Sequence, residues 1–113
     1  MAKFYFSKSY EKSLSVIEDF IFDSTQSIDL IESFLNEHDE TLNFIAQNPS
    51  TPAVQPTTGE QSWIFGDGRY RLFFKVINNQ DDIKIYFTHI IDNRQANLKI
   101  YPSNSLATYY EED

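Results

Sequence analysis

Residues 69–76 (RYRLFFKV) and 83–89 (IKIYFTH) decide the fold of this chain. Polar and apolar side chains alternate along both stretches, and the polar residues 78–82 separate them. Alternation with a period of two is typical of half-buried strands, and two such strands joined by a polar turn predict a β-hairpin. This hairpin also carries a large share of the chain's basic residues.

The sequence before this hairpin predicts the remaining strands and helices. Residues 3–6 (KFYF) predict a short edge strand, and residues 62–65 (SWIF), followed by the glycine turn at 66–68, predict another. Two helices are expected between them, the first capped by Ser7 or Ser9 and the second by Ser27. Their apolar stripes are Tyr10, Leu14, Ile17 and Ile21 in the first and Ile28, Ile31, Leu35, His38, Leu42 and Ile45 in the second. Asn48-Pro49 ends the second helix, and the Pro-rich stretch 49–61 predicts a loop.

The predicted order is therefore β-α-α-β-β-β, which indicates the α+β class. We expect an antiparallel sheet with the N-terminal helical hairpin packed on one face. One domain over residues 1–102 and an acidic tail over residues 103–113 account for the whole chain.

Charge is unevenly distributed along these 113 residues, whose net charge is −8. Residues 13–68 contain ten acidic side chains and neither Lys nor Arg. A protein this negative repels phosphate at long range, so we expect no strong direct binding of nucleic acid. The chain has no cysteine, no apolar run long enough to span a membrane and no metal-ligand spacing. It is expected to be cytoplasmic, without membrane partner, metal or cofactor.

Arg71 and His89 are the candidate site residues within the hairpin. Alternation puts Arg69, Arg71 and Lys75 on one face of the first strand. The register that pairs the apolar faces of both strands puts His89 on the core side, away from Arg71, so a β-bulge is needed to bring the two together. His89 is accordingly either a structural residue or a site residue. His38, in a helix-packing stripe, is expected to be a core residue.

The chain resembles the RelE/ParE superfamily of bacterial toxins over nearly its whole length. The resemblance rests on the helical hairpin ending at residues 42–49, the glycine turn and strand at 68–76 (GRYRLFFKV), and the ending 87–94 (FTHIIDNR). It implies a toxin of a type II toxin–antitoxin pair, bound by a cognate antitoxin protein. In the RNA-cutting branch the strand arginine stabilises the scissile phosphate and a terminal histidine acts as general acid. Those positions correspond to Arg71 and His89 here, with Arg69, Lys75 and Arg94 as partner or phosphate contacts.

The chain departs from the RNA-cutting branch at three points. Thr51 aligns with the glutamate that acts as general base, Glu60 is the only carboxylate nearby and does not match its register, and Ile90 replaces the terminal tyrosine. These departures favour the ParE-like branch, which inhibits DNA gyrase by protein contact. The alternatives are a ribosome-dependent mRNA endonuclease that uses Arg71 and His89, and a non-toxic binding domain that has kept the fold.

Overall fold

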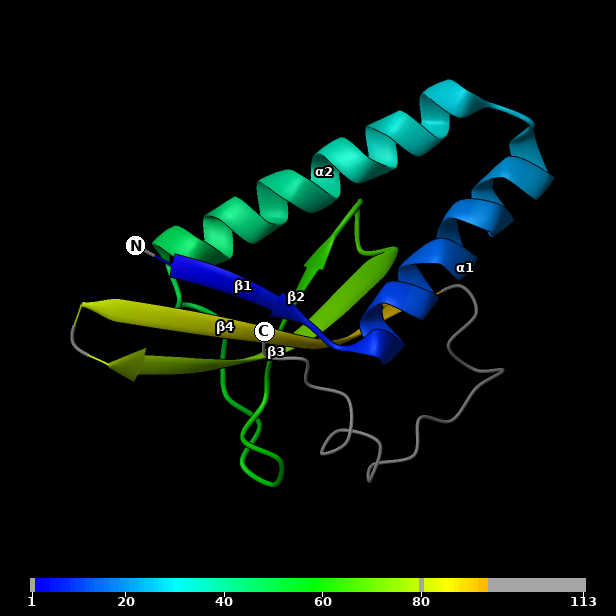
Figure 1. Cartoon of the computed structure of the whole chain (residues 1–113). Coiled ribbons are helices and arrows are strands. Elements are labelled where there is room, and N and C mark those ends of the chain that lie inside the picture. The colour runs from blue at the N-terminus through cyan, green and yellow to red at the C-terminus, as the bar shows by residue number, and fades with distance from the viewer. Residues whose placement is uncertain (1, 80, 94–113) are drawn as a thin grey trace.

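A computed structural model describes residues 2–79 and 81–93, in which two helices and four strands follow the predicted order (Figure 1). The elements are β1 (Ala2–Phe6), α1 (Lys8–Thr25), α2 (Ile28–Gln47), β2 (Gln61–Phe65), β3 (Tyr70–Asn79) and β4 (Asp82–Asp92). The order β-α-α-β-β-β and the α+β class are thus confirmed. The predicted acidic tail, residues 103–113, lies outside the described residues.

The helices begin and end where local sequence predicts. The side chain of Ser7 accepts a hydrogen bond from the Tyr10 amide at 2.9 Å, and that of Ser27 accepts one from the Leu30 amide at 3.1 Å. Each cap satisfies an amide that has no partner within its helix. At the other end of α2, the amide of Asn48 donates to the carbonyl of Phe44 at 2.9 Å, and Pro49 follows.

The four strands form one sheet in the order β1-β4-β3-β2. β3 pairs antiparallel with both β2 and β4, as predicted, whereas β1 pairs with β4 in parallel, so the sheet is mixed. Alternation within a strand fixes which side chains share a face but carries no information on the direction of a partner distant in sequence. The sequence pattern therefore could not predict that β1 pairs with β4 in parallel.

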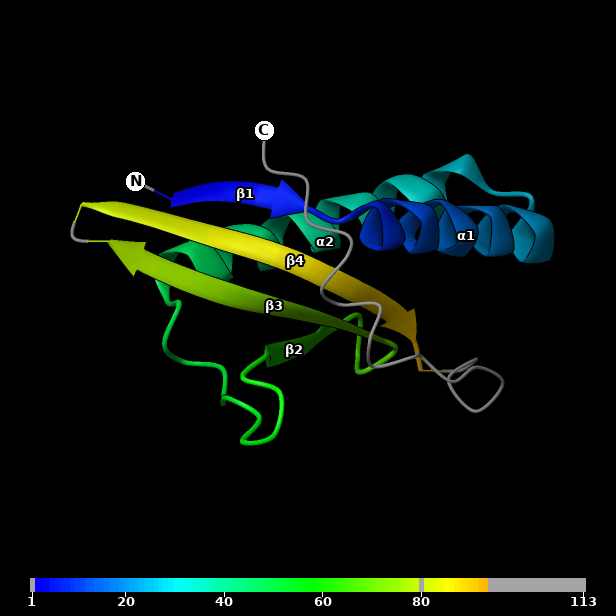
Figure 2. The same cartoon turned by 60° about the horizontal axis from the view of Figure 1, so that its bottom comes forward.

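Both helices lie against the same face of the sheet, which leaves the opposite face free of helices (Figures 1 and 2). The core between helices and sheet is rich in aromatic and branched side chains. Its fully buried members include Tyr10, Ile45, Leu72, Phe74, Ile85, Phe87 and Ile90. Each such apolar side chain stabilises the fold by about 1.5–3 kcal/mol relative to exposure. Within residues 2–79 and 81–93, neither helix is sufficiently long and apolar to cross a membrane.

Candidate functional site

A β-bulge in β4 determines where His89 lies. Phe74 pairs with Phe87, but the next residue back along β3, Phe73, pairs with His89, so Thr88 is an extra residue in the ladder. Beyond a bulge the two faces of a strand exchange. Ile90 consequently enters the core, where it is 1% exposed, and His89 turns to the face opposite the helices. The regular register, with His89 on the core side, is wrong.

We call this surface the helix-free face and define it by Tyr5, Arg71, Phe73, Lys75, Tyr86 and His89, which the strand register groups together. Arg71 pairs with Ile91, so Arg71 and His89 are diagonal neighbours, at a separation of about 7–8 Å by ordinary sheet geometry. Arg71 Nη1 donates a hydrogen bond to Ser62 Oγ on β2 at 2.6 Å. The sheet therefore holds the guanidinium in a defined position on the same face as the imidazole.

Glu60 joins this group from the loop before β2. Thr88 Oγ1 donates to Glu60 Oε2 at 2.6 Å, and both residues are buried. The sequence pattern predicts no role for Glu60, because its register does not match that of the general base in the toxins that the chain resembles. Thr51, the aligned position, is exposed on the loop. The path of the loop, rather than any local motif, brings the carboxyl group to the bulge, so the sequence contained no signal for it.

The His89 ring is enclosed by its neighbours. Its centroid lies 6.1 Å from that of Phe73 with the planes at 87°, and its Nδ1 is 3.3 Å from Thr88 Oγ1. Burial lowers the pKa of His89 below its usual value, and the negative charge of Glu60 opposes this shift. The imidazole is therefore mainly neutral near pH 7, a state in which it accepts a proton more readily than it donates one.

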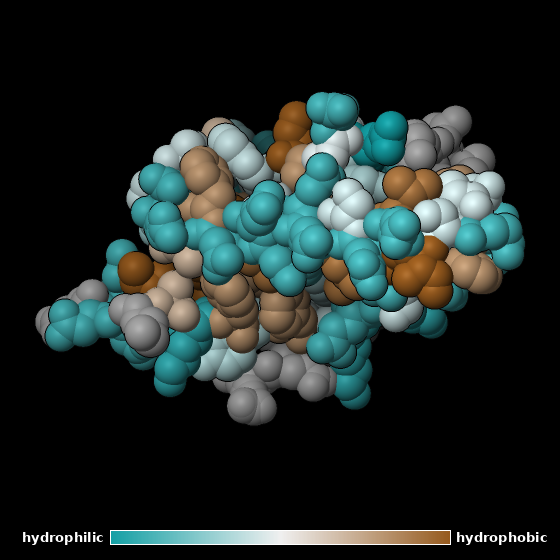
Figure 3. Space-filling model, turned by 90° about the horizontal axis from the view of Figure 1, so that it is seen from above, coloured by the Kyte–Doolittle hydropathy of each residue, from teal (hydrophilic) through white to brown (hydrophobic). Residues whose placement is uncertain are grey.

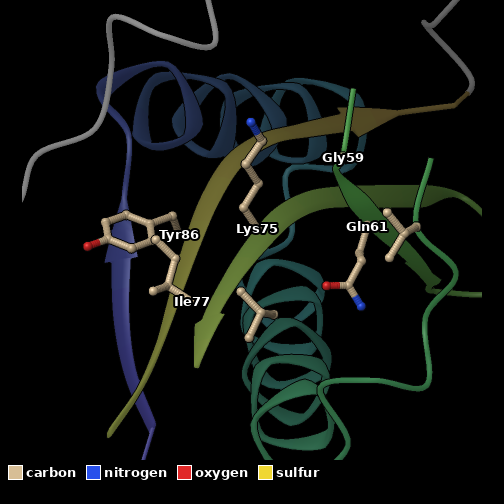
Figure 4. A pocket seen from close by; sticks show the side chains of 7 residues that line it. Gly59, Gln61, Lys75, Ile77 and Tyr86 are labelled. Atoms are coloured by element: carbon tan, nitrogen blue, oxygen red, sulfur yellow. The ribbon is translucent and has the colours of Figure 1, made fainter. Parts of the chain in front are cut away.

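The remaining candidate residues are distributed over the molecule. Arg69 is exposed at the turn between β2 and β3 and lines a cleft of about 180 Å³ against the helices, together with Glu37. Lys75 lines a different pocket, of about 430 Å³, at the edge of β3 (Figure 4). Arg94 lies outside the described residues. Of the predicted site residues, the structure thus brings together Arg71 and His89 but places Arg69 elsewhere.

His38 is a core residue, as its place in the helix stripe predicts. Its Nε2 lies 2.6 Å from the Tyr10 hydroxyl, which links α2 to α1 inside the core. Burial lowers the pKa of His38, against the opposing effect of Asp39. Among residues 2–79 and 81–93, no cluster of three or more His, Cys, Asp or Glu side chains is arranged to hold a metal ion.

The outer surface of the helices differs chemically from the sheet. Seen from above the helices, the surface is mainly hydrophilic, with hydrophobic side chains in separate groups (Figure 3). The acidic residues of the two helices are Glu11, Glu18, Asp19, Asp23, Asp29, Glu32, Glu37, Asp39 and Glu40. The helix-free face instead carries Arg71 and Lys75. The uneven charge of the sequence thus becomes an acidic helical side and a more basic sheet side.

Comparison of the chain with protein-family models and with curated proteins found no match.

Proposed function

We propose that this chain is the toxin of a type II toxin–antitoxin pair, resembling the RelE/ParE superfamily and acting in the cytoplasm. The element order, the helical hairpin on one sheet face and the strand 68–76 that carries Arg71 support this proposal. Its binding partner would be a cognate antitoxin protein. Its acidic helices and more basic sheet fit an antitoxin segment of mixed charge.

Within that family we favour growth inhibition through protein contact, with DNA gyrase as the target. The observation that carries this choice is the environment of His89, which is 7% exposed and has a pKa lowered by burial. A general acid must be protonated and must reach its substrate, and a neutral, enclosed imidazole meets neither condition. The Arg71 guanidinium also already donates a hydrogen bond, to Ser62 Oγ.

Expression of the chain alone tests the proposal. We expect growth arrest on induction, loss of supercoiling by gyrase in the presence of the purified protein, and no change in either when Arg71→Ala or His89→Ala is introduced into a folded protein. Normal growth at high expression, with gyrase unaffected, would contradict the proposal and favour a non-toxic binding domain.

A ribosome-dependent mRNA endonuclease is the second candidate, and the bulge at Thr88 is the observation that favours it. The bulge puts His89 on the same face as Arg71 and next to a carboxyl group, that of Glu60. A guanidinium can stabilise the phosphate charge, and an imidazole and a carboxylate can act as general acid and base in phosphoryl transfer to a 2′-hydroxyl. On this reading, mRNA is cut within ribosome-bound codons, and Arg71→Ala removes about 2–4 kcal/mol of transition-state stabilisation. Toxicity that survives both alanine substitutions excludes it.

A further inference from the structure

The part of β3 that extends beyond β2 has a free edge. β2 pairs with β3 only as far as Gln61 opposite Phe74, whereas β3 continues to Asn79 along its partner β4. None of the described residues pairs with the β2 side of β3 between Lys75 and Asn79. Every second residue of such an edge directs its main-chain N–H and C=O outward, which makes the edge a template for another extended chain.

A preformed pocket of about 430 Å³ lies beside this edge (Figure 4). Its lining comes from β3 and β4 (Lys75, Val76, Ile77 and Tyr86), from the start of β2 (Gln61) and from the preceding loop (Val54 and Gly59). The loop wall is held by hydrogen bonds, since Gln61 Nε2 donates to the carbonyls of Pro49 at 2.7 Å and Pro52 at 2.9 Å. The amide of Gly59 also donates to the carbonyl of Gln55 at 2.8 Å. The pocket therefore exists before any ligand arrives.

The residues that line this pocket determine which chemical groups can bind in it. Val54 is 58% exposed and Ile77 47% exposed, so apolar surface is available on both walls. Lys75 is the one charged residue of the lining, and no ion pair among the described residues involves it. Its ammonium favours an acidic group, and the two apolar side chains favour an apolar one.

We infer that the β3 edge from Lys75 to Asn79 binds an extended peptide by strand addition. The peptide runs antiparallel to β3 over about 17 Å, places an acidic side chain opposite Lys75, and places an apolar side chain two residues away, opposite Ile77. Main-chain pairing supplies affinity and the two side chains supply specificity. This inference does not depend on the proposed toxin function.

A synthetic peptide of about eight residues, with glutamate and valine two positions apart among threonines, is a suitable probe. The control is the same peptide N-methylated at alternate residues, which removes the amide donors of one edge. We expect the unmodified peptide to shift the NMR resonances of residues 75–79 and to protect from hydrogen exchange those amides of this stretch that point away from β4, with a Kd below about 1 mM. The methylated peptide should leave them unchanged.

Matched variants separate the side-chain contributions. We expect Lys75→Glu to weaken binding about tenfold or more, whereas Lys3→Glu, the same charge change at an exposed position of the outer strand β1, has no effect. Ile77→Ala should weaken binding by about threefold to tenfold. Ile64→Ala, which removes an isoleucine of similar exposure (45%), should not.

Any of four results would overturn the inference. They are edge amides that are already protected in the free protein, no binding up to about 1 mM, equal binding of the methylated peptide, and equal binding by Lys75→Glu. Equal binding of the methylated peptide would identify the pocket as a site for side chains or small apolar acids without strand pairing.

Discussion

Replacing Thr88 by valine removes the hydroxyl group at the centre of the bulge while keeping the shape of the side chain. Thr88 is 2% exposed, and its Oγ1 donates to Glu60 Oε2 at 2.6 Å. Valine is at least as favourable as threonine in a strand, so the substitution introduces no conformational penalty of its own. The substitution removes the donor of a carboxyl oxygen of Glu60, itself 6% exposed, and with it two longer contacts of 3.3 Å, to the Phe73 carbonyl and to His89 Nδ1.

A hydrogen bond to a carboxylate contributes about 1.5–3 kcal/mol, and an acceptor left buried without a partner costs a similar amount. We therefore expect Thr88→Val to lower the free energy of unfolding by about 2 kcal/mol, which corresponds to a decrease of about 8 °C in Tm for a domain of this size. Thr41→Val is the matched control. Thr41 is also buried, but its hydroxyl donates at 2.8 Å to the Glu37 carbonyl of its own helix, so its loss should cost less than about 0.5 kcal/mol.

Urea denaturation of both variants provides the measurement, and a cycle with Glu60→Ala isolates the pair. The coupling energy between Thr88 and Glu60 should be at least about 1 kcal/mol. Equal losses for Thr88→Val and Thr41→Val, or a coupling energy near zero, would refute the reasoning, because the Glu60 carboxyl group would then be satisfied by other means.

Three further predictions concern stability. Burial lowers the pKa of His38 below the ordinary histidine value of 6.5, so at pH values below 6.5 His38 takes up a proton more readily in the unfolded chain than in the folded one. The free energy of unfolding should therefore be highest above pH 6.5 and should fall as the pH drops toward and through the folded pKa. Denaturation at several pH values should show a weaker dependence for His38→Gln, and an unchanged slope would contradict the assignment. Gly66→Ala should destabilise the protein more than Gly68→Ala in thermal unfolding. Both glycines have positive φ, but only at Gly66 would an added Cβ lie 2.8 Å from the Tyr70 ring. Equal decreases in Tm would argue against this clash. Phe74→Ala, at a fully buried position, should cost about 3–5 kcal/mol in urea denaturation, and a loss below about 1 kcal/mol would mean that the core collapses around the gap.

The features that local sequence predicts correctly are those that depend on neighbours along the chain. The caps at Ser7 and Ser27 each need only an amide three residues ahead, and the glycine turn at 66–68 needs only its own backbone freedom. The helical stripes and the alternation in β3 and β4 also act over short distances. Together they suffice for the α+β class and the order of elements.

The features that the sequence does not reveal depend on residues far apart. The bulge at Thr88 is fixed by the pairing of β4 with β3 and by a carboxyl group twenty-eight positions away, on Glu60. The parallel pairing of β1 joins the two ends of the described chain. The candidate site was accordingly predicted in part: Arg71 was on the expected face, whereas His89 reached it only through the bulge and Glu60 through the path of its loop.

The bulge at Thr88 changes the direction of every later side chain of β4. In a regular ladder His89 and Ile91 would lie opposite Leu72 and Tyr70 in the core, and Ile90 and Asp92 would face outward. The bulge instead turns Ile90 and Asp92 inward, where they are 1% and 4% exposed. Because one isoleucine is buried in either register, apolar burial does not by itself select the bulge. The choice between protein contact and RNA cleavage therefore rests on the environment of His89, whose 7% exposure and lowered pKa do not suit a general acid, and the alanine variants of Arg71 and His89 test it.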